Sequence, residues 1–273
     1  MHTPIKRQSV FMAIITMGEL IFHSVVRSNR KSHRNAVVGL VLSMFQAVIF
    51  VAIFYAMFIL LGMRSAPIRG DYLLYIMSGV FLFLTHNKAM GAVAGAEGPT
   101  SAMMKHAPLN TLISIVSSAL SALYMQTLTL ICILYLYHTV IERITIYDPV
   151  KAFGCLLLAW LSGIAVGLIF LSLKPWFPNF ANVANQVYSR ANMLASGKMF
   201  VANATPNYIL KLFAWNPLFH CIDQARGYIF INYFPHKSSL MYPIYVSIAL
   251  IMIGLMAEFF TRKRVSLSWF ATR

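Results

Sequence analysis

The chain has 273 residues, of which 59% are hydrophobic and 11% are charged, and its formal net charge is +15. Because a soluble domain has about 25% charged residues, this composition excludes an ordinary soluble protein and predicts one all-α membrane domain. The positive charge does not indicate nucleic-acid binding, since many basic residues lie in two tails, as is typical of cytoplasmic retention beside membrane spans. These residues are Lys6, Arg7, Arg27, Arg30, Lys31, Arg34, Arg262, Lys263, Arg264 and Arg273.

Residues 10–30 predict an amphipathic helix at the membrane surface. Apolar side chains such as Phe11 and Phe22 recur at helical spacing on one face, and polar ones such as Glu19 and His23 occupy the opposite face. A polar basic face opposite an apolar face is typical of helices that lie in the bilayer interface. The alternative is a short first span, which Glu19 and His23 would make costly at the bilayer centre.

Long apolar segments follow this helix. Crossing the hydrocarbon requires about 20 apolar residues in a helix. Clear spans are predicted at roughly 37–62, 72–93, 109–137, 150–173 and 240–261. Five crossings would put the two basic tails on opposite sides, whereas both tails carry the charge typical of the cytoplasmic side. A sixth crossing is therefore expected.

The sixth span is expected at about 182–204, although this segment contains Arg190 and Lys198. Charged side chains are costly against lipid but not against protein or water. We therefore expect the polar side of this helix to line protein or a water-filled space, with Arg190 and Lys198 in its wall. Residues 206–235 then form two apolar pieces, each too short to cross, which meet where Pro217 breaks the helix. A re-entrant pair of short helices at the outer side is predicted.

Candidate chemistry is sparse. The lysine in Ser196-Gly197-Lys198-Met199 lacks the glycine and the Ser or Thr of an ATP-binding P-loop. The acidic residues and histidines show no catalytic or metal-binding spacing, and the three cysteines indicate no disulfide framework. Tyr55, Tyr124 and Trp160 lie inside spans and are candidates for stacking on sugar rings in a pore, with packing or membrane-interface positions as the alternative.

Two patterns of residues between 186 and 230 are similar to those of a known family. Arg190 precedes Ser196-Gly197 and Pro206, and Asn216-Pro217-Leu218 precedes His220 and Arg226. With the surface helix, six spans and a re-entrant pair, they resemble the ABC-2 family of transporter permeases, most of all those that export capsular polysaccharide or O-antigen. The N-terminal part departs from the family, which often has Arg-Glu at Gly18-Glu19, and tryptophan and proline where this chain has Leu42 and Gln46.

The resemblance implies a half-channel that pairs with a second copy of the chain. A separate cytoplasmic ATPase subunit would dock on each copy and bind ATP and Mg, so that no cofactor and no metal are expected on this chain. The surface helix and the polar segment 95–107 would receive the ATPase. By sequence, this segment is equally a turn or a docking helix. Candidate contacts are Glu19, Glu97, Lys105 and His106. Candidate residues of an outer gate are Trp215, Asn216, Pro217, His220 and Arg226.

The expected function is export of a lipid-linked or anionic cell-surface polysaccharide across a bacterial inner membrane, with both termini cytoplasmic. Expected partners are a second copy, two ATPase subunits, membrane lipid and the polysaccharide, with periplasmic and outer-membrane export proteins left open. Export of a lipid or a drug is the alternative within the family. A membrane-embedded enzyme of cell-envelope synthesis is the alternative of another class, although the sequence shows none of the clustered acidic or histidine residues usual in such enzymes.

Overall fold

The computed structural model describes residues 10–32, 35–60, 68–98 and 111–270. In these ranges the chain consists of helices joined by turns and loops, and it contains no β-strand. This confirms the predicted all-α class. The helices in chain order are α1 (Val10–Ser32), α2 (Ala36–Leu60), α3 (Tyr72–Ala94), α5 (Thr111–Val140), α6 (Pro149–Leu173), α7 (Pro178–Ala195), a 3-10 turn (Ala202–Ala204), α8 (Asn207–Phe213), α9 (Pro217–Ile229) and α10 (Met241–Phe270).

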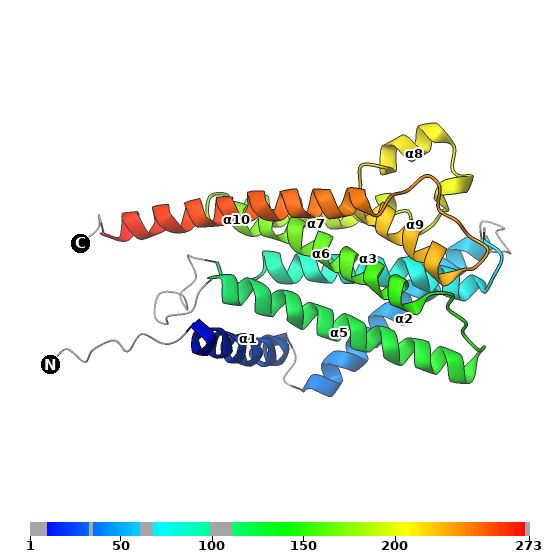
Figure 1. The fold of residues 1–273 in the computed structure, drawn as a ribbon, viewed down its shortest axis with the longest axis horizontal. Coiled ribbons are helices and arrows are strands. Elements are labelled where there is room, and N and C mark those ends of the chain that lie inside the picture. The colour runs from blue at the N-terminus through cyan, green and yellow to red at the C-terminus, as the bar shows by residue number, and fades with distance from the viewer. Residues whose placement is uncertain (1–9, 33–34, 61–67, 99–110, 271–273) are drawn as a thin grey trace.

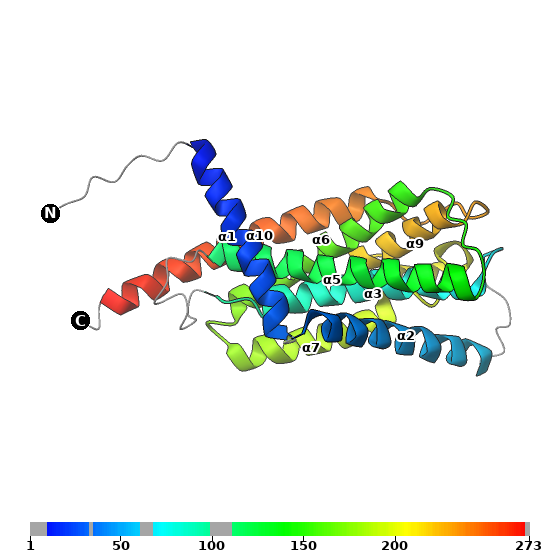
Figure 2. The ribbon, with the colours of Figure 1, turned by 90° about the horizontal axis from the view of Figure 1, so that it is seen from below.

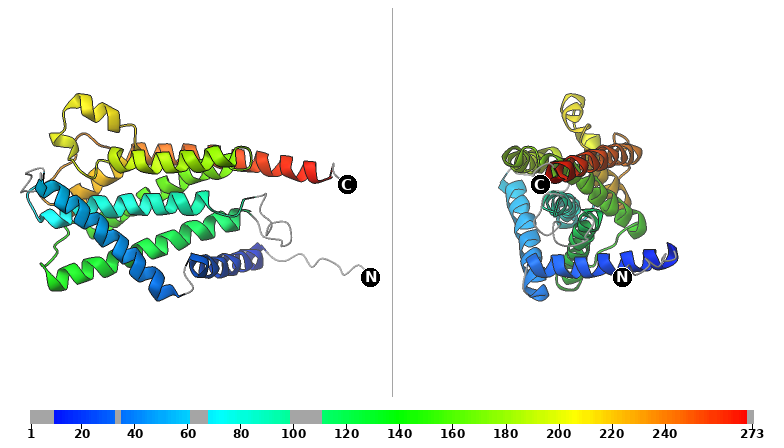
Figure 3. Two further views of the ribbon diagram at one scale, coloured as in Figure 1. Left: turned by 180° about the vertical axis from the view of Figure 1, so that it is seen from behind. Right: turned by 90° about the vertical axis from the view of Figure 1, so that its left-hand side faces the viewer.

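The long helices form an antiparallel bundle. Following the chain, α2, α3, α5, α6, α7 and α10 lie roughly along the long axis of the molecule, each running opposite to the one before (Figures 1 and 2). Helix α1 instead lies across the bundle, near the end toward which α10 runs (Figure 3), and packs mainly on α5. The short helices α8 and α9 lie at the opposite end, where α8 projects from the bundle (Figures 1 and 3).

Four helices in the described ranges are long and apolar enough to cross a bilayer, and they indicate a membrane protein. Their apolar segments are Val37–Leu60, Thr111–Val140, Pro149–Leu173 and Met241–Lys263. The segments 72–93 and 182–204, which we also expect to cross, correspond to α3 and α7, and these two helices are not in that group.

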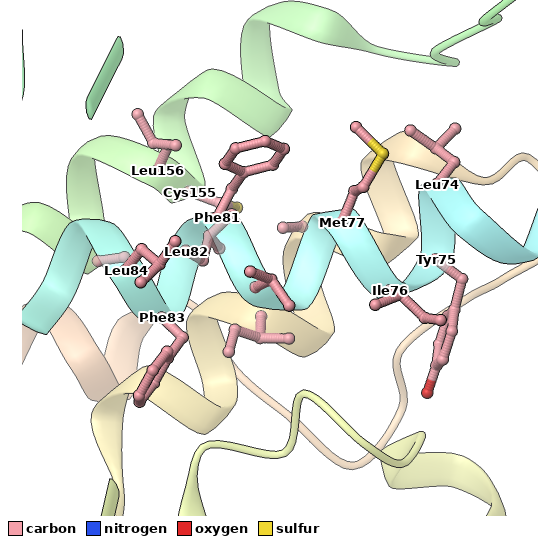
Figure 4. Packing of buried hydrophobic residues seen from close by; sticks show 14 of the residues in the cluster. Leu74, Tyr75, Ile76, Met77, Phe81, Leu82, Phe83, Leu84, Cys155 and Leu156 are labelled. Atoms are coloured by element: carbon pink, nitrogen blue, oxygen red, sulfur yellow. The ribbon is translucent and has the colours of Figure 1, made fainter. Parts of the chain in front are cut away.

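Helix α3 is the centre of the bundle and packs on α2, α5, α6 and α9. Most of its side chains are buried, including the polar His86. Figure 4 shows Phe81 beside Cys155 and Leu156 of α6, within the largest buried apolar cluster. Because α3 is surrounded by protein rather than lipid, it can carry polar groups that would be costly on a lipid-facing helix.

Two glycines bring α6 against α3. A Cβ atom at Gly163 would lie 2.3 Å from the carbonyl oxygen of His86, and one at Gly167 would lie 2.7 Å from that of Met90. The four-residue spacing puts both glycines on one face of α6, and it puts both carbonyls on one face of α3. Small residues four apart are a common means of close helix packing in membranes, and here they seat α6 on the central helix.

Helix α7 ends earlier than expected. Gly197 has a φ of +72°, a left-handed conformation that favours glycine and ends helices. The expected segment 182–204 is therefore helical only up to Ala195 and continues as a turn toward the 3-10 turn at Ala202–Ala204. Eighteen residues of helix at about 1.5 Å each give a length of about 27 Å, close to the thickness of the hydrocarbon.

Candidate functional site

A stripe of exposed polar side chains runs along α7. It consists of Asn179, Asn182, Gln186 and Arg190, all of which are exposed, and their spacing of three and four residues aligns them on one side of the helix. Next to this polar stripe lies an apolar stripe that is also exposed, formed by Phe180, Val183, Val187 and Leu194. Helix α7 thus presents two chemically different surfaces to its surroundings.

The third side of α7 faces the bundle and includes a polar connection to α3 and α6. The Tyr188 hydroxyl lies 3.4 Å from Nε2 of His86, and Nδ1 of His86 lies 2.8 Å from Oγ of Ser162. Ser162 donates its own proton to the carbonyl of Ala159, so Nδ1 of His86 donates to Ser162 and Nε2 accepts from Tyr188. These contacts place Tyr188 against the bundle, on the side of α7 away from the polar stripe.

Arg226 of α9 holds the turn that follows α7. Its side chain is fully buried; Nη1 donates to the carbonyls of Gly197 (3.1 Å) and Phe200 (2.8 Å), and Nη2 donates to the carbonyl of Lys198 (2.5 Å). The guanidinium also lies over the Tyr75 ring, 4.1 Å from its centroid. A planar guanidinium suits several carbonyls at once. Arg226 therefore fixes the backbone of this turn.

Asn216 connects the start of α9 to the end of α7. Its Oδ1 accepts from the backbone N–H of Leu218 and caps α9, with Pro217 in the first turn. Its Nδ2 donates to Oδ1 of Asn192 at 2.7 Å and to the carbonyl of Ala195 at 3.0 Å. The buried Asn216 side chain thus pairs with a free N–H at the start of α9 and with a free carbonyl at the end of α7.

His220 and Asp223 anchor the loop between α9 and α10. Nε2 of His220 lies 2.7 Å from the carbonyl of Ala214, which only accepts, and Nδ1 lies 3.1 Å from the N–H of Ser239, which only donates. His220 is therefore a neutral imidazole with its proton on Nε2. Asp223 accepts from Tyr233 and from the hydroxyl of Ser238, both at 2.6 Å. Burial and then the adjacent Asp223 carboxylate raise the pKa of Tyr233, so its hydroxyl stays protonated and donates.

A cavity of about 780 Å³ lies between α1, α2, α3 and α5. Seven serines line it together with Gln46, Asn87, Lys88 and Arg27. Lys88 and Arg27 are exposed to this space or its mouth, and Ser121 donates to Asn29 at 2.5 Å, connecting α5 to α1. The cavity thus has polar groups within a lining that is mostly apolar, and α1, the helix that lies across the bundle, forms one of its sides.

The two basic candidates for the wall of a path have different surroundings. Arg190 belongs to the exposed polar stripe, whereas the Lys198 side chain is buried and directed toward rings of α2 and α3. Of the aromatic candidates, Tyr124 lines the cavity, and Tyr55 is exposed on α2 with its ring 5.8 Å from that of Tyr72. Trp160 donates from Nε1 to the carbonyl of Ala119 and so connects α6 to α5.

The candidate contacts for an ATPase are only partly described. Glu19 is exposed on α1. Glu97 lines the cavity, and its backbone N–H donates to Ser114 at 3.0 Å. Lys105 and His106 lie outside the described residues. Of the outer-gate candidates, Trp215 is exposed and its carbonyl accepts from Tyr242. The other four, Asn216, Pro217, His220 and Arg226, are buried at the start of α9 or along it.

From the sequence we named Asn216, His220 and Arg226 as candidates but missed Asp223, although the sequence contains a signal for all four. Asn216, His220, Asp223 and Arg226 recur every three or four residues in an otherwise apolar segment, which is the pattern of one polar helix face. His86 and Tyr188 are far apart in sequence and gave no local signal. Within the described residues, no three His, Cys, Asp or Glu side chains come together as a metal site requires. No family model matches the chain, and no match is found among curated proteins.

Proposed function

We propose that the chain is one half of a membrane exporter and that the polar stripe of α7 lines its translocation path. The stripe carries this proposal. It is exposed on the single chain and lies on a helix within a bundle of membrane-spanning type. An arginine at the centre of a bilayer costs about 2.5–3.5 kcal/mol on insertion scales, so a stripe containing Arg190 and three amide side chains is stable only against water or protein.

A second copy of the chain completes the path in this proposal. The apolar stripe beside the polar one can face lipid or the second copy, while the polar stripe faces the space between the two copies. In this proposal the chain crosses the membrane six times, and α3 is shielded from lipid by protein and α7 by the path. With six crossings, α1 and the end of α10 lie on the same side of the membrane, as the basic residues of both tails predict. The pair α8 and α9 then lies at the opposite, outer side as a re-entrant element.

In this proposal, a separate ATPase subunit drives the transport. The sequence of this chain contains no P-loop pattern. Helix α1, which lies across the inner end of the bundle, offers a surface for docking. The serine, amide and basic side chains in the cavity between α1, α2, α3 and α5 support entry of a hydrophilic cargo on the same side. Arg190, Lys88 and Arg27 favour an anionic cargo, and a cell-surface polysaccharide, lipid-linked or free, fits this chemistry.

Purification of the tagged chain from its native membrane in mild detergent tests the proposal. We expect a second, differently tagged copy and a protein with the GxxxxGK[ST] sequence to co-purify. ATP hydrolysis by this complex should be abolished when the P-loop lysine of the partner is replaced. Recovery of the chain as a monomer without an ATPase, from a preparation that keeps a known membrane complex intact, would contradict the proposal.

A further inference from the structure

The side chain of Lys198 lies in a cage of phenylalanine rings. Its Nζ is 3.5 Å from the ring centroid of Phe83 on α3, and 4.5 Å and 6.0 Å from those of Phe54 and Phe50 on α2. Phe50 also lies near both other rings, with centroid separations of 6.3 Å to Phe54 and 6.1 Å to Phe83. We call Lys198 with these three rings the lysine cage.

The cage does not satisfy the amino group that it encloses. Lys198 is 3% exposed, and its Nζ has no hydrogen-bond partner in the described part of the chain. Rings within about 6 Å attract a cation, yet an ammonium has three N–H donors and prefers oxygen acceptors. Removal of an ammonium from water is costly, and contact with the rings compensates for that cost only in part. An anionic group that reached Nζ would therefore bind it strongly.

The rings of the lysine cage lie along α2 and α3 about one helical turn beyond polar residues that line the cavity. Gln46 of α2 and Asn87 of α3 line the cavity. Phe50 and Phe83 are each four residues from one of these, in the direction away from α1, so each lies one helical turn further on the same face. A group that leaves the cavity between α2 and α3 in this direction meets the rings first and Lys198 next.

The backbone of Lys198 is held by hydrogen bonds, whereas the end of its side chain is held only by the rings. Arg226 holds the carbonyls of Gly197, Lys198 and Phe200, so the turn stays in place. The lysine stem has four carbons and several rotatable bonds, and no hydrogen bond retains its end. The side chain can leave the rings without unfolding the turn.

We propose that the lysine cage is an anion-operated latch: the three rings and Lys198 close the path from the cavity, and a polyanionic saccharide opens it by drawing Lys198 out of the cage. The proposal rests on the proposed export function for its cargo. It adds that Lys198, rather than Arg190, is the first cation that the anionic groups meet beyond the cavity, and that neutral saccharides leave the latch closed.

Nuclear magnetic resonance tests the latch on the purified chain in lipid nanodiscs, with 13C at Cε of lysine. Ring currents should displace one Cε methylene signal upfield, and that signal should be absent in Lys198→Met. Methionine keeps an unbranched apolar stem among the rings, so this variant should fold. Addition of dextran sulfate oligosaccharides should move the displaced signal to the ordinary lysine position. Neutral dextran oligosaccharides of equal length should leave it in place.

A binding measurement provides the second arm. Fluorescent dextran sulfate oligosaccharides should bind Lys198→Met about ten-fold more weakly than the unchanged chain, because one charge-assisted contact is lost, and Lys198→Arg should restore most of the affinity. Equal affinities for the unchanged chain and Lys198→Met would overturn the proposal. An upfield Cε signal that moves with neither saccharide, or moves equally with both, would also overturn it. Co-purification of the ATPase does not depend on Lys198, so the export function can hold while the latch fails.

Discussion

Nη2 of Arg226 donates to the backbone carbonyl of Lys198 at 2.5 Å. An arginine on α9 thus holds the backbone of Lys198, whose side chain lies in the lysine cage. Two buried basic residues have thus divided their roles. Arg226 donates to three carbonyls through Nη1 and Nη2 and lies over a tyrosine ring, and these contacts fix the turn although its Nε has no hydrogen-bond partner among the described residues. Lys198 has no acceptor there for Nζ, the one polar atom of its side chain. The fixed turn gives the lysine a defined place beside the cavity.

Arg226→Lys should destabilise the chain. Lysine cannot reach three carbonyls in the geometry of the guanidinium fork, so at least two buried acceptors lose their donors at about 1–3 kcal/mol each. We expect the free energy of unfolding to fall by at least about 2 kcal/mol, seen as a melting temperature lower by about 5 °C in detergent at a fixed heating rate. The exposed Arg143, changed to lysine, is the matched control and should melt like the unchanged chain.

Gly197→Ala should also destabilise the turn after α7. The residue has a φ of +72°, and an added Cβ would lie 2.4 Å from a ring carbon of Phe219. A left-handed conformation alone costs a non-glycine residue about 1 kcal/mol, and the contact adds to it. Thermal unfolding should show a loss of at least about 2 kcal/mol. Gly154→Ala on α6, where an added Cβ meets no atom within 4 Å, should be neutral or stabilising, and an equal loss in both variants would contradict the role of the turn.

Gly163→Ala should separate α6 from α3. The new methyl group would lie 2.3 Å from a backbone oxygen of α3, which cannot rotate away, so the helices must move apart at about 1–3 kcal/mol. The connection from Ser162 to His86 would lengthen with them. Gly91→Ala on α3 has open space at its Cβ and serves as the control. The measurement is the melting temperature of both variants, and indistinguishable values would refute the close packing.

Replacement of residues of the polar stripe should reduce transport without loss of stability. Gln186→Leu and Arg190→Leu remove exposed polar groups, so the melting temperature in detergent should stay the same or rise. Export should nevertheless fall several-fold, because the path loses groups that replace the hydration of a hydrophilic cargo. Val187→Leu, on the neighbouring apolar stripe, should export normally. Full export by a correctly folded Arg190→Leu chain would show that Arg190 does not line the path.

The sequence was sufficient for the helices and insufficient for their surroundings. Uncharged runs located α2, α5, α6 and α10 because lipid imposes the same apolar requirement on every residue of a lipid-facing helix. An uncharged run also located α3, but it could not show that α3 is surrounded by other helices, and it did not locate α7, which contains Arg190. The end of α7 depended on Gly197, and a glycine at that position is compatible with either helix or turn until the Phe219 ring and the Arg226 fork are in place.

The candidate site was predictable in its residues but not in its connections. The patterns around Arg190, Asn216, His220 and Arg226 directed attention to 186–230, where the buried network lies. Local spacing cannot show that Asn216 meets Asn192, or that His86 meets Tyr188 across more than a hundred positions. Local spacing also could not distinguish Lys198 from Arg190, since both are basic residues of the same segment. Lys198 lies in the lysine cage, whereas Arg190 is exposed.

The central claim is that the polar stripe of α7 faces a water-filled path within the membrane, and cysteine accessibility tests it most directly. Gln186→Cys and Val187→Cys place a thiol on adjacent residues that are both exposed on the single chain. In native membranes, a small charged thiol reagent should modify Gln186→Cys rapidly and leave Val187→Cys at the background given by the three natural cysteines. Equal protection of both positions, or faster modification of Val187→Cys, would contradict the account.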